Sequence, residues 1–152
     1  MRRTSIAIFA LLMVAVFSVF AAAGTGLRVE TQGWDKYKAA GVDTELGFPA
    51  VPLHPLVEVL GWYSGEDAPT SHLQAGLGAR LYLTAPASGL FVEGKMRYVA
   101  TFGAESGTST VLVVGAGYRL RPIIGGIDLY VGATTTEHPV LPKYFIGARV
   151  GF

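Results

Sequence analysis

The chain contains no cysteine, and few of its residues carry a charge. Its 152 residues include 12 lysines and arginines and 11 aspartates and glutamates, which together make 15% of the chain. The absence of cysteine excludes a disulfide framework, a thiol nucleophile and a lipid-modified N-terminal cysteine. Soluble domains carry about 25% charged residues, so these charges are too few to cover an ordinary water-facing surface. Either the core is large and dry, or part of the surface does not face water.

The first 23 residues have the composition of a secretory signal peptide. Arg2 and Arg3 precede an apolar run over 6–20, and three alanines at 21–23 are typical of a cleavage site. A retained membrane anchor is the alternative, because residues 4–23 are long enough to span about 30 Å of hydrocarbon. We expect cleavage after Ala23. The mature chain then keeps 10 of the 12 basic residues against 11 acidic ones, without the clustered basic excess that nucleic-acid binding needs.

From position 24 onward, apolar and polar residues alternate repeatedly, which indicates β-strands. The clearest run is 72–83, where leucine and alanine alternate with His72, Gln74, two glycines, Arg80 and Tyr82. We expect eight strands, at 27–32, 42–48, 56–63, 72–83, 90–100, 110–120, 127–134 and 144–152. Their links alternate between polar loops and shorter turns, except for the proline-dense link 49–55. The pattern predicts one all-β domain over 24–152, an eight-stranded antiparallel up-and-down barrel whose closure removes exposed strand edges.

The charged residues and many of the glycines occupy the same alternate positions of these strands. This distribution indicates which face of the barrel is inside. A soluble carrier barrel has an apolar lumen and a charged exterior, whereas a membrane barrel has the reverse. The polar register holds six positive and six negative residues: Arg28, Arg80, Lys95, Arg97, Arg119, Arg149, Glu30, Asp43, Glu45, Glu58, Glu93 and Asp128. The same register holds many glycines, which suit a narrow lumen because they leave room for long side chains. Balanced signs also suit a lumen, where an unpaired charge would cost several kcal/mol.

We therefore expect these twelve residues to form a charge network in the lumen and the apolar register to face lipid. Arg149 should pair with a carboxylate of a neighbouring strand, and the strand that carries Glu30 is its neighbour upon closure. Aromatic residues near the strand ends favour the same interpretation, because two aromatic girdles flanking an apolar band are typical of a membrane interface. They are Trp34, Tyr63, Phe102 and Tyr144 at one end and Phe48, Tyr118 and Phe152 at the other.

The last nine residues, YFIGARVGF, end the chain on an aromatic residue. Together with the signal segment and the eight runs, this ending resembles the small outer-membrane β-barrels of the outer membrane protein A, outer membrane protein X and opacity-protein class. The resemblance covers 24–152. It implies an outer-membrane location, with membrane lipid and the barrel assembly machinery as partners. It also implies that Tyr144, Ile146, Ala148, Val150 and Phe152 form the signal that this machinery reads. The loops are short for an adhesin.

Three histidines are the candidates for chemistry. His54 lies in the proline-dense link, where we expect it to be solvated, and His138 lies in the last polar loop. His72 could act as a general base for Ser71 or Ser109, but adjacent strand residues such as Ser71 and His72 point to opposite faces. A pair formed by His72 and His138 lacks the further ligands that define a metal site. We assign no catalytic residue, metal or cofactor.

The function expected from the sequence is structural or interactive: envelope integrity, or surface contacts through the loops. An eight-stranded lumen is just wide enough for side chains, which argues against a general porin. Two alternatives stay open. One is a lipid A-modifying acyl enzyme with a site at the outer rim, and the other is a periplasmic lipocalin-like carrier. The pattern carries no information on oligomeric state.

Overall fold

A computed structural model describes residues 24–32, 37–47, 51–64, 70–85, 88–102, 106–121, 126–138 and 141–152. Eight β-strands make up most of this part of the chain: β1 (Thr25–Thr31), β2 (Lys38–Glu45), β3 (Leu53–Ser64), β4 (Thr70–Tyr82), β5 (Gly89–Phe102), β6 (Gly107–Leu120), β7 (Ile127–Thr134) and β8 (Tyr144–Gly151). The expected signal segment 1–23, Trp34, Phe48 and the side chain of Tyr63 lie outside the described part. None of the described segments forms a helix long and apolar enough to span a membrane.

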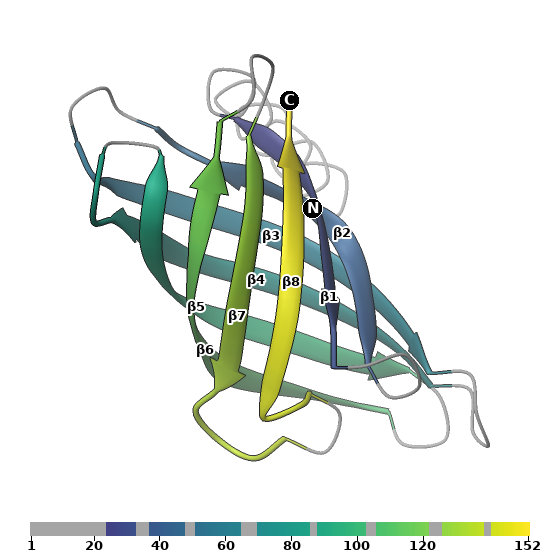
Figure 1. Ribbon diagram of the computed structural model, residues 1–152. Helices are drawn as coiled ribbons and strands as arrows, with labels where there is room; N and C mark the ends of the chain where they lie inside the picture. Colours follow the sequence, from purple (N-terminus) through teal and green to yellow (C-terminus); the bar gives the residue numbers. More distant parts are fainter. Residues whose placement is uncertain are drawn as a thin grey trace, which may run out of the picture.

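The strands form a closed barrel in sequence order, each antiparallel to its neighbours (Figure 1). The barrel closes where β1 pairs with β8, with Leu27 opposite Val150 and Arg28 opposite Arg149. This confirms the predicted eight-stranded antiparallel barrel. We call the end where β1 begins and β8 ends the turn side, and the end where β1 ends and β8 begins the loop side.

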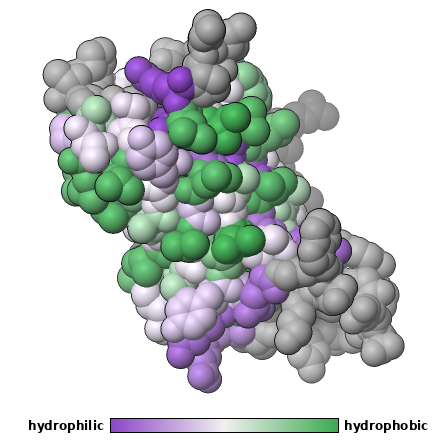
Figure 2. All heavy atoms as spheres, in the orientation of Figure 1, coloured by the Kyte–Doolittle hydropathy of each residue, from purple (hydrophilic) through white to green (hydrophobic). Residues whose placement is uncertain are grey.

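Burial alternates along the strands with the sequence pattern. In β5, Glu93, Lys95 and Arg97 are buried whereas Val92, Met96 and Tyr98 are exposed. The exposed residues of the barrel wall are predominantly apolar, and Figure 2 shows hydrophobic side chains across the wall in that view. Among the described strand residues, the one exposed charged side chain is that of Lys38, the first residue of β2. The wall is therefore apolar outside and charged inside.

Six of the eight strands begin earlier than the alternation predicts, and the early starts of β2 and β3 bear on the proline-dense link. β2 starts at Lys38 rather than at 42, and β3 starts at Leu53 rather than at 56. The prediction that 49–55 is entirely a link was therefore wrong. Pro55 has no N–H to donate, but its carbonyl still accepts a hydrogen bond from Leu46 N at 2.9 Å. Because β3 is extended in this way, His54 occupies a strand position on the lumen side, opposite Arg80.

Glycines in the lumen register lie beside large side chains, as the sequence predicts. A Cβ added at Gly76 would approach Cγ of Glu58 to 2.6 Å. Aromatic rings use this space as well, a feature absent from the prediction. The ring of Tyr130 on β7 lies over Gly147, its direct partner on β8, and a Cβ at that position would overlap the ring. An aromatic ring that covers a cross-strand glycine is a recognised means of stabilising a curved sheet.

This packing predicts different costs for two similar substitutions. Gly147→Ala should lower the free energy of unfolding by about 1–3 kcal/mol, because the new methyl group overpacks against Tyr130. Gly94→Ala should change it by less than about 0.5 kcal/mol, because nothing lies within 4 Å of a Cβ at Gly94. Urea unfolding of the refolded protein in detergent micelles, followed by tryptophan fluorescence, measures both. Equal effects of the two substitutions would contradict this packing.

Candidate functional site

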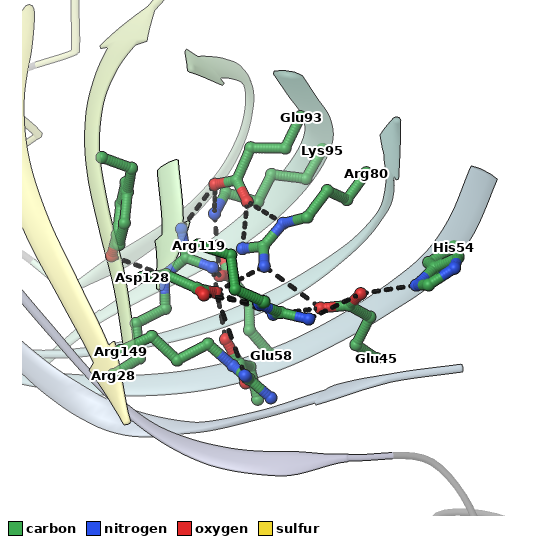
Figure 3. Close-up of polar contacts among 12 residues, drawn as sticks. Arg28, Glu45, His54, Glu58, Arg80, Glu93, Lys95, Arg119, Asp128 and Arg149 are labelled. Atoms are coloured by element: carbon green, nitrogen blue, oxygen red, sulfur yellow. Dashed lines mark hydrogen bonds and ion pairs between the residues drawn. The ribbon is translucent and has the colours of Figure 1, made fainter. Parts of the chain in front are cut away.

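The lumen contains all twelve charged residues that the sequence placed there. All are at most 9% exposed, and Arg28, Arg80, Arg97 and Asp128 are completely buried. Figure 3 shows most of these side chains, such as Arg28, Arg80 and Arg119, converging from strands on different sides of the barrel. All eight strands contribute at least one of these residues. Strand alternation accounts for this arrangement, because residues two apart on one strand project from the same face.

Arg28 on β1 lies at the centre of the network. Its Nη2 donates to Oε1 of Glu93 at 2.5 Å, and its Nε donates to Oε1 of Glu30 at 3.1 Å. Its Nη1 lies 3.3 Å from both Oδ2 of Asp43 and Oε2 of Glu58. The five N–H groups of a guanidinium have a fixed planar arrangement, so one arginine connects carboxylates from four strands.

Two further arginines hold the turn side of the network together. Arg80 on β4 contacts Oδ2 of Asp128 at 2.6 Å, Oε2 of Glu93 at 2.8 Å and Oε2 of Glu45 at 3.1 Å. Arg119 on β6 contacts two of these three carboxylates as well, with 2.6 Å from Nη2 to Oε2 of Glu45 and 2.6 Å from Nε to Oδ1 of Asp128. Glu45 and Asp128 are thus shared between two guanidinium groups.

Toward the loop side, Arg97 and Lys95 on β5 complete the pairing. Arg97 binds Glu30 in a bidentate manner, with 2.8 Å from Nη1 to Oε2 and 2.5 Å from Nη2 to Oε1, and it also contacts Glu58. Lys95 Nζ lies 2.9 Å from Oε2 of Glu58 and 2.7 Å from Oε1 of Glu93. Bidentate, charge-assisted contacts of this kind are the strongest hydrogen bonds in proteins.

Arg149 has a partner on a neighbouring strand, as expected, but its shorter contact crosses to another strand. Its Nη1 lies 3.9 Å from Oδ2 of Asp128 on β7, and its Nε donates to Oδ1 of Asp43 on β2. Glu30 is not its partner, although β1 is its neighbour. The reason is the register, which places Arg149 opposite Arg28 across the β1–β8 seam.

Each of the six carboxylates contacts at least two basic side chains, and the two signs are equal in number. Burying one charge without a partner would cost several kcal/mol. Because the positive and negative residues are equal in number and share their contacts, no charge of this network is buried without a partner of opposite sign. The network therefore fills the lumen with a neutral, hydrogen-bonded plug.

Four aromatic rings, to which the sequence assigned no role, lie over four of the five arginines of this plug. Arg80 lies 4.0 Å from the ring centre of Phe91, and Arg28 lies 4.2 Å from that of Tyr130. The other two pairs are Arg119 with Tyr82, at 5.2 Å, and Arg97 with Phe145, at 5.4 Å. These are cation–π distances. The sequence does contain a signal for two of these rings, because residues an even number of positions apart on a strand point to the same face. Phe91 therefore faces inward with Glu93, and Phe145 faces inward with Arg149.

An apolar layer covers the plug on the loop side. It is formed by buried residues that include Tyr37, Leu60, Val99, Val111, Val113, Leu141 and Phe145. Gln74 lies at its edge and donates to the hydroxyl of Tyr37 at 3.2 Å, which in turn donates to Glu30. Gln74 Oε1 is the buried side-chain polar atom that has no hydrogen-bond partner among the described residues. The lumen is thus filled by two layers of different chemistry.

Of the three histidines, His54 is the one that does not lie where the sequence predicted, because it is part of β3 rather than of a solvated link. His54 is 1% exposed, so the expectation that it is solvated was wrong. His72 is buried on β4, and its Nδ1 lies 3.1 Å from Oγ1 of Thr101. Ser109 instead contacts His138, with 2.5 Å between Oγ and Nε2.

The tautomer of His138 decides what this serine contact can do. The backbone N–H of Leu141 donates to Nδ1 of His138 at 3.1 Å, so the proton of the neutral ring lies on Nε2. Nε2 therefore donates to Ser109, which is the reverse of the arrangement that a general base needs. Burial lowers the pKa of His138, which favours this neutral form. The contact fastens the loop after β7 to β6.

The residues of the expected assembly signal lie on the outer wall. Tyr144, Ile146 and Val150 are exposed, Ala148 is partly exposed, and Phe152 follows the end of β8 with 71% exposure. The described members of the expected aromatic girdles, Phe102 and Tyr144 on the loop side and Tyr118 and Phe152 on the turn side, are all exposed. Within the described ranges, no three histidine or acidic residues are grouped to hold a metal ion.

Comparison with known proteins gives no relative: no family model matches the chain, and no curated protein matches it significantly.

The network predicts that losing one charge costs more than losing a pair. Arg97→Met should lower the free energy of unfolding by about 3–5 kcal/mol, because Glu30 and Glu58 lose a buried partner. Arg97→Met combined with Glu30→Gln should lower it by less, since the lumen is neutral again. Urea unfolding in micelles measures both, and Lys38→Ala, which removes an exposed charge, is the control with less than about 0.5 kcal/mol. A double variant less stable than Arg97→Met would refute this account.

Proposed function

We propose that this protein is an outer-membrane β-barrel with a side-chain-filled lumen and a structural or surface-interaction role. The observation that carries the proposal is the distribution of charge and apolar surface across the wall. Residues such as Leu77, Met96 and Val131 are 58–67% exposed, while all twelve charges of the lumen register are buried. Transmembrane barrels have an apolar exterior and a polar interior.

The energetics of the two faces support this assignment. An arginine or lysine that faces lipid at mid-depth would cost about 2–4 kcal/mol, and the one exposed charge on the described strands is that of Lys38, the first residue of β2. In water, the same wall would expose a large contiguous apolar surface, which soluble monomers rarely do. A closed barrel also satisfies the backbone hydrogen bonds that lipid cannot satisfy.

A periplasmic lipocalin-like carrier is the soluble alternative. Such a barrel needs an apolar cavity for its ligand and a charged exterior. The present lumen is occupied by ion pairs over most of its length, and the apolar residues at its loop side are packed against one another. These features favour the membrane barrel over the carrier.

The C-terminal strand supports an outer-membrane location in particular. Tyr144, Ile146, Ala148 and Val150 share the outward register of β8, and Phe152 continues it. This is the pattern that resembles the assembly signal of the outer membrane protein A, outer membrane protein X and opacity-protein class. Membrane lipid and the barrel assembly machinery are the partners that this class implies.

The filled lumen favours a structural or surface role over transport. A water-filled passage would require an uninterrupted polar path, whereas here the ion-pair plug and the apolar layer follow one another along the axis. What the protein offers to its surroundings is then its wall and its loops.

Migration on SDS gels tests the proposal directly. In isolated outer membranes, an unheated sample should run differently from a boiled one, because a closed membrane barrel resists SDS until it is heated. Removal of Phe152 should reduce the heat-modifiable form, since the proposed assembly signal is then incomplete. Recovery of the intact protein in the soluble periplasmic fraction would support the carrier and overturn the membrane barrel.

The enzyme alternative has one contact in its favour, between Ser109 and His138, and one against it, between Leu141 N and His138 Nδ1. We expect lipid A from cells with the protein and from cells without it to have the same acyl composition by mass spectrometry. Cells with Ser109→Ala should give the same result. A change in acyl chains that depends on Ser109 would establish the enzyme instead.

A further inference from the structure

His54 has two hydrogen-bond acceptors, one at each ring nitrogen. It lies near the turn-side end of β3, with only 1% of its surface exposed. Its Nε2 is 2.9 Å from the backbone carbonyl oxygen of Val51, and its Nδ1 is 2.6 Å from Oε1 of Glu45. Figure 3 shows the ring pointing toward Glu45 at the edge of the ion-pair network.

The chemistry of the two partners fixes the protons of the ring. A carbonyl oxygen can only accept, so Nε2 must donate. Glu45 also can only accept, provided that it is ionised, and its surroundings require this. Its oxygens receive hydrogen bonds from the hydroxyl of Tyr82 at 2.8 Å, from Arg80 at 3.1 Å and from Arg119 at 2.6 and 3.2 Å. With donors on every side, no neighbour remains to accept a carboxyl proton, so Nδ1 must donate as well.

We infer that His54 is a proton-dependent latch at the turn-side mouth of the lumen. With a proton on both nitrogens, the ring ties the link residue Val51 to Glu45, and through Glu45 to the arginines of the plug. After the loss of one proton, only one nitrogen still donates, so one of the two ties is lost. The latch closes on protonation and loosens on deprotonation.

The charged and titratable groups around the ring determine the consequences of this step. Glu45 faces it from β2, Arg80 and Tyr82 face it from β4, and Arg119 reaches the same carboxylate from β6. The ring of Tyr82 packs edge-on against His54, with 5.0 Å between the ring centres. The lumen network holds six positive and six negative residues without His54, so the protonated ring is a seventh cation. Protonation thus adds both a tie and a net positive charge at this mouth.

The switch is confined to the mouth, because other bonds hold the surrounding backbone in either state. Leu46 N donates to the carbonyl of Pro55, and Tyr82 N donates to that of Pro52, both at 2.9 Å. Neither bond involves a titratable side chain. Deprotonation therefore breaks the connection between Val51 and Glu45 through the ring and leaves the barrel wall closed. The latch acts at the turn-side mouth and does not depend on the proposed membrane location.

Nuclear magnetic resonance of the mature protein, refolded in detergent micelles, tests the latch. Long-range 1H–15N spectra with 15N-labelled histidine show which ring nitrogens carry protons, and 13C labelling reports the carbonyl of Val51. A pH series then shows whether the two groups change together. The Val51 carbonyl shift should move at the pH at which the His54 ring loses one of its two N–H signals, and it should stay constant while both are present.

Two substitutions serve as variant and control. His54→Phe keeps a ring beside Tyr82 but has no nitrogen, so the pH-dependent movement of the Val51 carbonyl should vanish. His138→Asn, on the loop side, should leave that movement unchanged. A singly protonated His54 ring at the acid end of the series would overturn the inference, and so would a Val51 shift that does not follow the ring. Both of these readouts come from the unsubstituted protein, so they stand even where His54→Phe does not fold.

Discussion

The structure depends on the pairing of buried charge inside a closed wall. Arg28 alone binds four carboxylates, and each carboxylate is shared by at least two cations. A buried ion network of this kind is weak evidence for net stability, because desolvation offsets much of its Coulomb energy. Its effect here is on specificity. With this register facing inward all twelve charges are paired, whereas the opposite register would place all twelve on the outer wall.

The glycines and aromatic rings follow from the same constraint. Long side chains from eight strands meet in a narrow space, so some positions must carry no side chain at all. Gly76 makes room for Glu58, and Gly147 makes room for Tyr130, which in turn lies against Arg28. The outer face has no such requirement and carries leucine, valine and methionine. The inward-facing register of the strands therefore holds the charged residues, the glycines that make room for them and the aromatic rings that cover them.

The number of strands, their order and their inward register could be predicted from the sequence, because alternation and charge repeat along the chain. Three features of the site could not. The first is the apolar layer: in β6, Val111 and Val113 face inward while Leu112 and Val114 face outward. Because this part of β6 is apolar on both faces, its sequence does not alternate and does not show which residues are buried. The second is the position of His54 on a strand, because Pro52 and Pro55 close to it predict a link between strands. The partner of Arg149 depends on the stagger of the strands, which alternation does not specify.

Many ion pairs of the plug cross the lumen rather than join neighbouring strands. Arg97 on β5 reaches Glu30 on β1, and Arg119 on β6 reaches Glu45 on β2. A sheet that is still open cannot form these contacts, because its two halves have not yet come face to face. Local hairpins are therefore left with unmatched charges until β8 meets β1. The ion pairs across the lumen and the closure of the wall therefore form together, so a half-built barrel gains little of the final stabilisation.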